Sequence, residues 1–153
     1  MSFTSLNYHV VFSTKHRKPV IDETIRERLY EYIGGIIRAK EGTQIEIGGI
    51  ADHIHLLAGC SPKMAVADWV RDIKANSARW MNELPDRKSR FEWQKGYGAF
   101  TVSASQVEVV QKYIQGQPEH HQRHSFRDEF LELLKRHNIE FDLKFVFEEE
   151  HHG

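Results

Sequence analysis

The first part of the chain contains two apolar patterns with different periods. The short apolar run Val10–Phe12 predicts a buried β-strand. Apolar residues then recur at helical spacing from Ile25 to Ile36, and Asp22 stands just before them, where an acidic side chain can cap a helix. The pattern therefore predicts a strand followed by a helix, which ends near Gly42.

The next segment alternates between polar and apolar positions, which is the period of a strand. The alternation runs over Gln44–Ile47 and again over His53–Ala58, with two glycines between them. It predicts a hairpin of two strands. Ser61-Pro62 predicts the start of a second helix, with the hydroxyl as cap and the proline in the first turn. The apolar stripe of this helix consists of Val66, Trp69, Val70, Ile73, Ser77, Trp80 and Met81.

The second half of the chain predicts one more strand and two more helices. Ala99–Ser103 is expected to be the strand, and Ser105 and Glu108 have the S-x-x-E spacing of a capping box that would open a third helix. Ser125 is expected to cap a fourth helix. Ile139–Phe147 alternates apolar with charged residues, so we expect a strand or an extended arm with one apolar face.

The order of these elements is β-α-β-β-α-β, followed by helices and the alternating segment. The natural closure for this order is a ferredoxin-like split β-α-β sandwich, an α+β fold with a four-stranded antiparallel sheet. Two helices would cover one face of the sheet and leave the other free for a ligand or nucleic acid. No repeat or linker interrupts residues 1–153, so we expect a single domain with C-terminal helices and an extended tail, acidic at about residues 148–153.

Charge is unevenly distributed, although the net charge is only −1. Residues 128–153 carry eight acidic and three basic residues, which leaves the rest of the chain with a net charge of +4. Trp93 and Tyr97 are candidates for stacking on bases, whereas Trp69 and Trp80 are expected in the core. Six basic side chains are candidates for contacts with DNA phosphates: Lys15, Arg17, Lys18, Arg71, Lys74 and Arg79.

Composition argues against several classes of protein. No apolar run approaches the roughly 20 residues of a membrane-spanning helix, and the N-terminus lacks the order of a signal peptide. The single cysteine, Cys60, excludes an internal disulfide and fits a reducing cytoplasm. The G-x-x-x-x-G-K-[ST] loop that cradles phosphates is absent from the sequence, so no nucleotide cofactor is expected.

Two histidines in the predicted hairpin form a candidate metal site. His53 and His55 lie two residues apart, so in a strand their side chains share one face, roughly 6.6 Å apart along the strand. Two imidazoles on an open sheet face can share one divalent metal ion. The same pattern fits two surface histidines on a half-exposed strand, and the spacing alone does not separate these interpretations.

A tyrosine and a glutamine on the predicted third helix form a second candidate pair. Tyr113 and Gln117 lie four residues apart and therefore share a face of the helix. Pro118 follows, and because the residue before a proline resists helical geometry, Gln117 could instead end the helix. Three histidines after this point are interpreted mainly as structural or phosphate-contacting groups: His120, His121 and His124.

Several segments of the chain resemble the motifs of one protein family, and they occur in the same order as in that family. Asp52–Leu57 resembles the HUH motif, in which two histidines flank a bulky apolar residue, and Val110–His121 resembles a Tyr-Ile-x-x-Gln-x-x-His-His nucleophile helix. Tyr8–Arg17, Phe91–Phe100 and the start of the fourth helix at Ser125 resemble segments of the same family. The family is that of the single-tyrosine HUH transposases of small insertion sequences, and the resemblance extends from about residue 6 to about residue 148.

The resemblance implies an activity and a set of site residues. It implies an enzyme that cuts and rejoins single-stranded DNA at insertion-sequence ends, with Tyr113 as the nucleophile of a 5′-phosphotyrosine intermediate. It also implies that His53, His55 and Gln117 are ligands of Mg²⁺ or Mn²⁺, in a basic site that would favour the phenolate. Expected partners are subterminal DNA hairpins and a second copy of the chain, with Tyr113 of one protomer facing the histidines of the other.

Two alternatives remain open from the sequence. A rolling-circle replication initiator or relaxase shares the HUH chemistry, although these proteins are usually longer and carry a third histidine ligand. A domesticated single-strand-binding module without activity would need the same sheet but not the intact set of Tyr113, His53, His55 and Gln117. We therefore take the cytoplasmic transposase as the main hypothesis.

Overall fold

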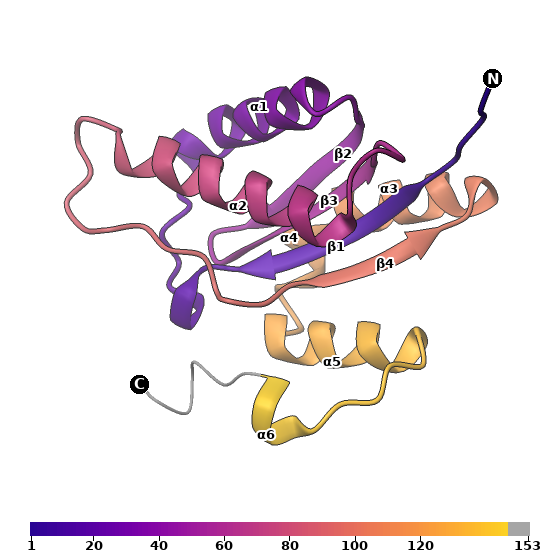
Figure 1. The fold of residues 1–153 in the computed structure, drawn as a ribbon. Helices are drawn as coiled ribbons and strands as arrows, with labels where there is room; N and C mark the ends of the chain where they lie inside the picture. The colour runs from indigo at the N-terminus through magenta and orange to yellow at the C-terminus, as the bar shows by residue number, and fades with distance from the viewer. Residues whose placement is uncertain (147–153) are drawn as a thin grey trace.

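The computed structural model describes residues 1–146, apart from the side chains of Lys144 and Phe145. Its elements follow the predicted order and continue into C-terminal helices (Figure 1). They are β1 (Asn7–Ser13), η1 (Lys15–Arg17), α1 (Glu23–Ala39), β2 (Thr43–Ile50), β3 (His53–Gly59), α2 (Val66–Asn82), β4 (Gly98–Val102), η2 (Ala104–Gln106), α3 (Val107–Gln115), α4 (Gln117–His120), α5 (Phe126–Arg136) and α6 (Leu143–Val146).

The four strands form one antiparallel sheet in the order β2-β3-β1-β4. This order confirms the ferredoxin-like prediction, because β3 lies between β1 and β2 and β4 closes the other side of β1 (Figure 1). In the β1–β3 ladder, Ser13 pairs with His53 and Val11 with His55. Paired residues of an antiparallel ladder share a face, so these four side chains lie on the same side of the sheet.

One face of the sheet packs against α1 and α2, as the sequence predicts. Strand residues such as Val10, Phe12 and Ile54 are fully buried there together with residues of both helices. Asp22 caps α1, because its side chain accepts hydrogen bonds from the backbone N–H groups of Thr24 and Ile25.

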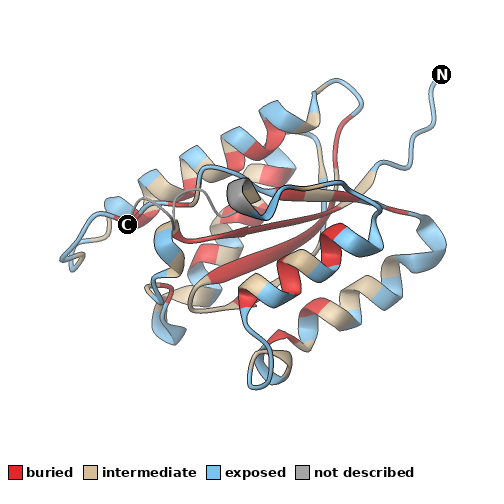
Figure 2. Cartoon of the chain, turned by 90° about the horizontal axis from the view of Figure 1, so that it is seen from below, coloured by how far each residue is buried: buried red, intermediate tan, exposed pale blue. Residues whose placement is uncertain are grey.

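The other face of the sheet is covered, so the expectation of an open face is wrong. Residues of α5 pack on Val11 and Phe100, and residues of α3 pack on Leu57. At Gly48, α3 approaches β2 so closely that a Cβ atom would lie 2.9 Å from the backbone oxygen of Ile114. The central strands are buried on both faces, which Figure 2 shows between the two layers of helices. A ligand site on this face therefore lies between the sheet and helices.

Two predicted helix starts are wrong. α2 begins at Val66 and not at Ser61-Pro62, because the Ser61 hydroxyl accepts the N–H of Lys63 in a turn that precedes the helix. The capping box at Ser105 does not form either. η2 comes first, α3 begins at Val107 without a side-chain cap, and the Ser105 hydroxyl pairs with Ser103.

The C-terminal segment was predicted to be a strand or an extended arm, and its described residues contain no strand: residues 139–142 have no regular structure. Leu143–Val146 forms a turn of helix, and the partly buried Phe141 and Val146 pack against the cluster formed by α5. Alternation over a few residues indicates only which side chains are apolar, and the packing surface decides the conformation. Phe147 and the acidic tail at 148–153 lie outside the described residues. Among the helices of residues 1–146, none is long and apolar enough to cross a membrane.

Candidate active site

The histidine pair lies in the middle of the covered sheet face. His53 and His55 come from β3, share that face as the sequence predicts, and are both fully buried. The ring of Phe126, at the start of α5, lies 4.8 Å from that of His53, and the ring of Tyr113 lies 5.7 Å from that of His55. The pair is therefore not exposed on a half-exposed strand. This excludes the interpretation of His53 and His55 as two surface histidines.

A second side chain contacts the Nδ1 atom of each histidine, on the side of the ring away from the centre of the site. The Nδ1 atom of His53 donates to the Asp52 carboxylate at 2.7 Å, and Nδ1 of His55 lies 2.8 Å from Nε2 of His9. Partners of this kind fix the ring orientation and leave the Nε2 atoms directed at the centre of the site. His9 comes from β1, and no local pattern in the sequence marks it, because its contact with His55 depends on how β1 pairs with β3.

A break between α3 and α4 places Tyr113 and Gln117 beside the histidines. α3 ends at Gln115, and Gln117 begins α4 after the intervening Gly116. Pro118 is tolerated because it lies in the first turn of α4, where a backbone N–H has no partner within the helix. The Gln117 side chain is buried, and its Oε1 atom lies 2.9 Å from Nε2 of His53.

The centre of the site is occupied by Glu129, a residue that the sequence analysis did not identify. Its side chain is 1% exposed and comes from α5. Tyr113 donates its hydroxyl hydrogen to Oε2, and the Gln117 amide donates to the same oxygen at 2.8 Å. The Oε1 atom lies 3.0 Å from Nε2 of His55. The only sequence signal was the acidic helix after Ser125, and nothing in it singled out this carboxylate.

The described residues include one group of side chains that fits a metal ion. Ligand atoms of His53, His55, His121 and Glu129 all lie within 4.8 Å of one another. Atoms bound to one ion at about 2.1 Å are at most about 4.2 Å apart, so only a small contraction is needed. Imidazole nitrogens with a carboxylate oxygen suit a divalent transition-metal ion, and the Asp52 contact to His53 is typical of histidine ligands.

Burial and contacts within the site shift the pKa values of its acidic and basic side chains. Burial alone would lower the pKa of His53, but its hydrogen bonds with Asp52 and Glu129 outweigh burial and raise this pKa to about 9. Burial would raise the pKa of Glu129, but hydrogen bonds from His121, His53 and His55 hold it well below its ordinary value. Burial and the nearby Glu129 carboxylate both raise the pKa of Tyr113. The protein groups alone therefore keep Tyr113 as a neutral phenol, opposite to the expectation for a basic site.

Two pockets lead to the site from either side of the segment that follows α4. One, of about 440 Å³, is lined by Tyr113, Glu129, His120 and Arg136 among others, so it opens directly onto the tyrosine. The other, of about 350 Å³, is lined by Arg17, Asp52 and His121 among others. His124 lines both pockets.

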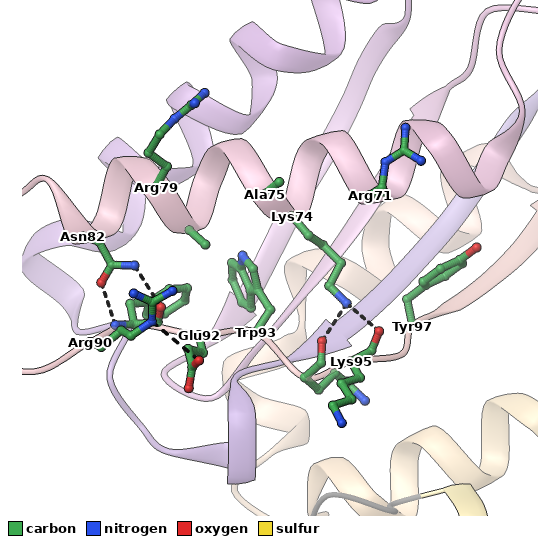
Figure 3. A pocket seen from close by; sticks show the side chains of 13 residues that line it. Arg71, Lys74, Ala75, Arg79, Asn82, Arg90, Glu92, Trp93, Lys95 and Tyr97 are labelled. Atoms are coloured by element: carbon green, nitrogen blue, oxygen red, sulfur yellow. Dashed lines mark hydrogen bonds and ion pairs between the residues drawn. The ribbon is translucent and has the colours of Figure 1, made fainter.

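A larger pocket of about 630 Å³ lies on the other side of the sheet, between α2 and the loop before β4 (Figure 3). Arg71, Lys74 and Arg79 line it, but each already has a protein partner. The Lys74 ammonium donates to the carbonyl oxygens of Gln94 and Gly96, at 2.7 and 2.9 Å.

The other two predicted DNA-contacting cations in this pocket are held by neighbours on their own helix. Arg71 pairs with Asp68 at 3.1 Å, and Arg79 donates to Asn76. Trp93, expected to stack on bases, is 8% exposed and donates to Ser77, so that expectation is wrong. Tyr97 is 36% exposed at the edge of the pocket.

The remaining three predicted DNA-contacting cations lie around η1. Lys15 pairs with Glu92 at 3.4 Å, Lys18 is exposed, and Arg17 lines the pocket next to His121. The tyrosine belongs to the same chain as the histidines that it approaches. In a single chain this contact is in cis, and the arrangement in trans that the sequence led us to expect stays a prediction for the homodimer.

Comparisons with known proteins identify the family to which this chain is similar. A family model described as "Transposase IS200 like" matches residues 2–117. The ISDra2 transposase TnpA of Deinococcus radiodurans is 30% identical over 117 residues, which cover 73% of this chain and 84% of that protein. The transposase for insertion sequence element IS200 of Salmonella typhimurium is 29% identical over 117 residues, which cover 73% of this chain and 76% of that protein.

Two solved structures resemble the fold. A crystallised transposase of Deinococcus radiodurans R1 superposes with a TM-score of 0.61 at 26% identity, covering 76% of this chain and 95% of that one. A REP-associated tyrosine transposase, solved bound to a REP hairpin, superposes with a TM-score of 0.59 at 15% identity, covering 79% of this chain and 74% of that one. With the family model matching most of its length and its histidine pair and tyrosine gathered in one site, this chain belongs to the IS200-like family of single-tyrosine HUH transposases.

Proposed function

We propose that this chain cleaves and rejoins single-stranded DNA through a covalent bond to Tyr113, with the help of a divalent metal ion. One observation carries the proposal. The Tyr113 hydroxyl and the His53–His55 pair converge on the same buried carboxylate, at the end of a pocket that opens to solvent. A nucleophile, a candidate metal site and an access route are thus together in one chain.

The reaction would exchange one phosphodiester for another. The Tyr113 oxygen attacks the scissile phosphorus, the bond from phosphorus to the 3′ oxygen breaks, and a 5′-phosphotyrosine and a free 3′-hydroxyl result. The phenol gives up its proton and the departing oxygen takes one up, so the step is balanced without a nucleotide cofactor. Attack by a 3′-hydroxyl of another strand reverses the step, joins the strands and restores the tyrosine.

His53, His55 and Gln117 are proposed to hold the metal, Mg²⁺ or Mn²⁺. When bound, the ion would act as a Lewis acid on a non-bridging oxygen of the phosphate. The protein supplies the rest of the chemistry: α3 holds the phenol, and Asp52 and His9 hold the imidazole rings. Because no bulk water reaches the buried histidines, charges in this site interact more strongly than they would at the surface.

The proposed substrate is single-stranded DNA that carries a hairpin near each transposon end. The hairpin bound to the REP-associated relative supports this class of substrate. Arg136 lines the pocket that contains Tyr113, and Arg17 lines the pocket beside His121. Lys15 and Lys18 extend the basic surface around η1. Arg71, Lys74 and Arg79 remain proposed phosphate contacts, provided that DNA displaces their present partners.

Two further properties are part of the proposal. One tyrosine per chain holds one DNA end at a time, so joint cutting of two ends calls for a homodimer. The substrate is the DNA of a bacterial or archaeal cell, so the cytoplasm is the proposed compartment.

The test is capture of the covalent intermediate. The chain is incubated with Mn²⁺ and a panel of hairpin oligonucleotides taken from the DNA on either side of its own gene. We expect an adduct that survives denaturation, is absent in Tyr113→Phe, and is lost when a chelator removes the metal. Tyr113→Phe should still bind the hairpin, because phosphate contacts and base stacking supply most of the affinity.

Two outcomes would contradict the proposal. An adduct that persists in Tyr113→Phe would place the nucleophile elsewhere, with the exposed Tyr97 as the next candidate. Hairpin binding without any adduct, at either metal and across the panel, would favour a binding module without activity.

A further inference from the structure

Two residues at the centre of the site lie beyond the segment that the family model matches. His121 follows α4, and Glu129 lies in α5, whereas the match ends at residue 117. Both side chains are almost completely buried, at 3% and 1% exposed. Their burial in a polar cluster is costly unless every polar atom has a partner, so the arrangement of those partners indicates their purpose.

The Oε1 atom of Glu129 is surrounded by imidazole nitrogens. The Nε2 atoms of His53, His55 and His121 lie 3.4, 3.0 and 3.1 Å from it. His55 and His121 lie within hydrogen-bond distance of Oε1 and match its roughly two lone-pair sites, whereas Nε2 of His53 bonds to the Gln117 oxygen at 2.9 Å and faces Oε1 from slightly farther away. If a metal ion replaces the Nε2 protons, the same three nitrogens would turn their lone pairs to one point next to a carboxylate, which is a donor set for a cation.

The second oxygen of Glu129 faces the nucleophile. Oε2 accepts the hydroxyl of Tyr113 and, at 2.8 Å, the amide of Gln117. Gln117 also reaches His53 through its own oxygen, at 2.9 Å, so its amide orients both the carboxylate and the ring. One carboxylate thus links the imidazole cluster to the tyrosine.

A structural ion pair is the simpler interpretation of a buried Glu129. Such a pair needs one cationic partner, and His53 alone would satisfy it. It does not account for His121, whose Nε2 atom is directed at the same oxygen while its Nδ1 atom is held 2.6 Å from the backbone oxygen of His124. A histidine anchored through one nitrogen, with the other directed at a shared point, is arranged as a metal ligand.

We propose that Glu129 and His121 are ligands of the same divalent ion as His53 and His55, and that Glu129 binds the ion through Oε1 while it holds Tyr113 through Oε2. The inference rests on the proposed function, because it extends the metal site proposed there. Its consequence is that one chain supplies the whole site, with two ligands from β3, Gln117 from α4, His121 after α4 and Glu129 from α5.

The test measures binding of Mn²⁺ to the full chain without DNA, by electron paramagnetic resonance of the free ion and by titration calorimetry. Glu129→Gln keeps the shape of the side chain and removes its charge. We expect this variant and His121→Ala to bind Mn²⁺ at least about tenfold more weakly than the unaltered chain. Glu132→Gln is the matched control on the same helix, because its exposed carboxylate pairs only with Arg136 among the described contacts, and it should bind within about twofold.

A second measurement protects the test against a folding defect. The shift in Tm that Mn²⁺ causes is compared with each variant's own metal-free Tm, so a lower starting stability does not enter. We expect the shift to be large in the unaltered chain and in Glu132→Gln, and to be small in Glu129→Gln and His121→Ala.

The outcomes separate this inference from the proposed function. If Glu129→Gln binds Mn²⁺ as tightly as the unaltered chain and shows the same shift in Tm, the inference is overturned while the proposed function stands. If the unaltered chain binds no Mn²⁺ and still forms the adduct in chelator, the metal requirement of both is overturned.

Discussion

At the scale of single residues, two histidines of the site have opposite preferences for the proton. Burial, with the neighbouring His55 adding to it, lowers the pKa of His9 to about 3. Burial also opposes the charge on His53, but its hydrogen bonds with Asp52 and Glu129 outweigh that effect and raise its pKa to about 9. His9 is therefore neutral and His53 charged in the metal-free protein at neutral pH.

These two pKa shifts predict how stability depends on pH. Between about pH 3 and pH 6.5 the unfolded chain binds a proton at residue 9 that the folded chain does not, so His9 makes stability fall as the pH falls. Between pH 6.5 and about pH 9 the folded chain keeps a proton on His53 that the unfolded chain has lost, so stability falls as the pH rises. Together they place the maximum near pH 6.5, with roughly 1.4 kcal/mol per pH unit from each group on its own side.

The contribution of His9 can be measured by urea unfolding in chelator at several values between pH 4.5 and pH 6.5. As the pH falls over this range, the free energy of unfolding of His9→Gln should decrease less steeply than that of the unaltered chain. The difference in slope should be about 1.4 kcal/mol per pH unit, the value for one proton. The exposed His16, changed to Gln, is the control and should leave the slope as it is. Equal slopes for His9→Gln and the unaltered chain would show that burial of His9 does not oppose its charge.

At the scale of elements, α5 matters because it brings Glu129 to the sheet. Its apolar face, which includes Phe126, Phe130 and Leu133, packs on β1 and β4. Its N-terminus is capped by Ser125, whose hydroxyl accepts the N–H of Asp128 at 3.1 Å. The helix is therefore held by one cap and one apolar face, and both were visible in the sequence.

Removing the cap should loosen this element. We expect Ser125→Ala to lower the free energy of unfolding by about 1 kcal/mol, which is the usual value of an N-cap. Ser105→Ala is a sharp control, because Ser105 has the spacing of a capping residue but its hydroxyl pairs with Ser103 instead. That change should stay within about 0.5 kcal/mol. Equal losses in the two variants, by urea unfolding, would mean that the cap at α5 adds nothing.

At the scale of the whole molecule, one chain contains every group of the candidate site. Tyr113, the histidines and Glu129 meet without a second protomer, so a homodimer would join two complete sites and would not need to share their parts. This differs from the trans arrangement expected from the sequence, which would require α3 and α4 to leave the pocket of their own chain.

Mixing two inactive variants decides between the arrangements. Tyr113→Phe and His55→Ala should each fail to form the adduct. For sites in cis, every chain of the mixture lacks one essential group, so co-expression should leave adduct formation at background. Recovery of a substantial part of the activity in the mixed dimer would show that the tyrosine serves the partner's histidines, and that the arrangement described here belongs to a resting state.

Local patterns in the sequence were enough to predict the order of the strands and main helices, although not every helix start or the C-terminal segment. The period of a strand put His53 and His55 on one face, and the order of the elements indicated the antiparallel sheet. Gln117 reaches the site through the break between α3 and α4 and not through helical spacing from Tyr113. Tertiary structure decided what covers that face. Glu129 is 74 residues from His55, and no local period relates them, because only the return of α5 across the sheet brings them together. The contact of His9 with His55 likewise depends on the pairing of β1 with β3. The helical turn at Leu143–Val146 depends on the apolar surface of α5 against which it packs. Local periodicity reports which side of an element is buried, whereas the residue that it meets there is set by contacts between distant segments.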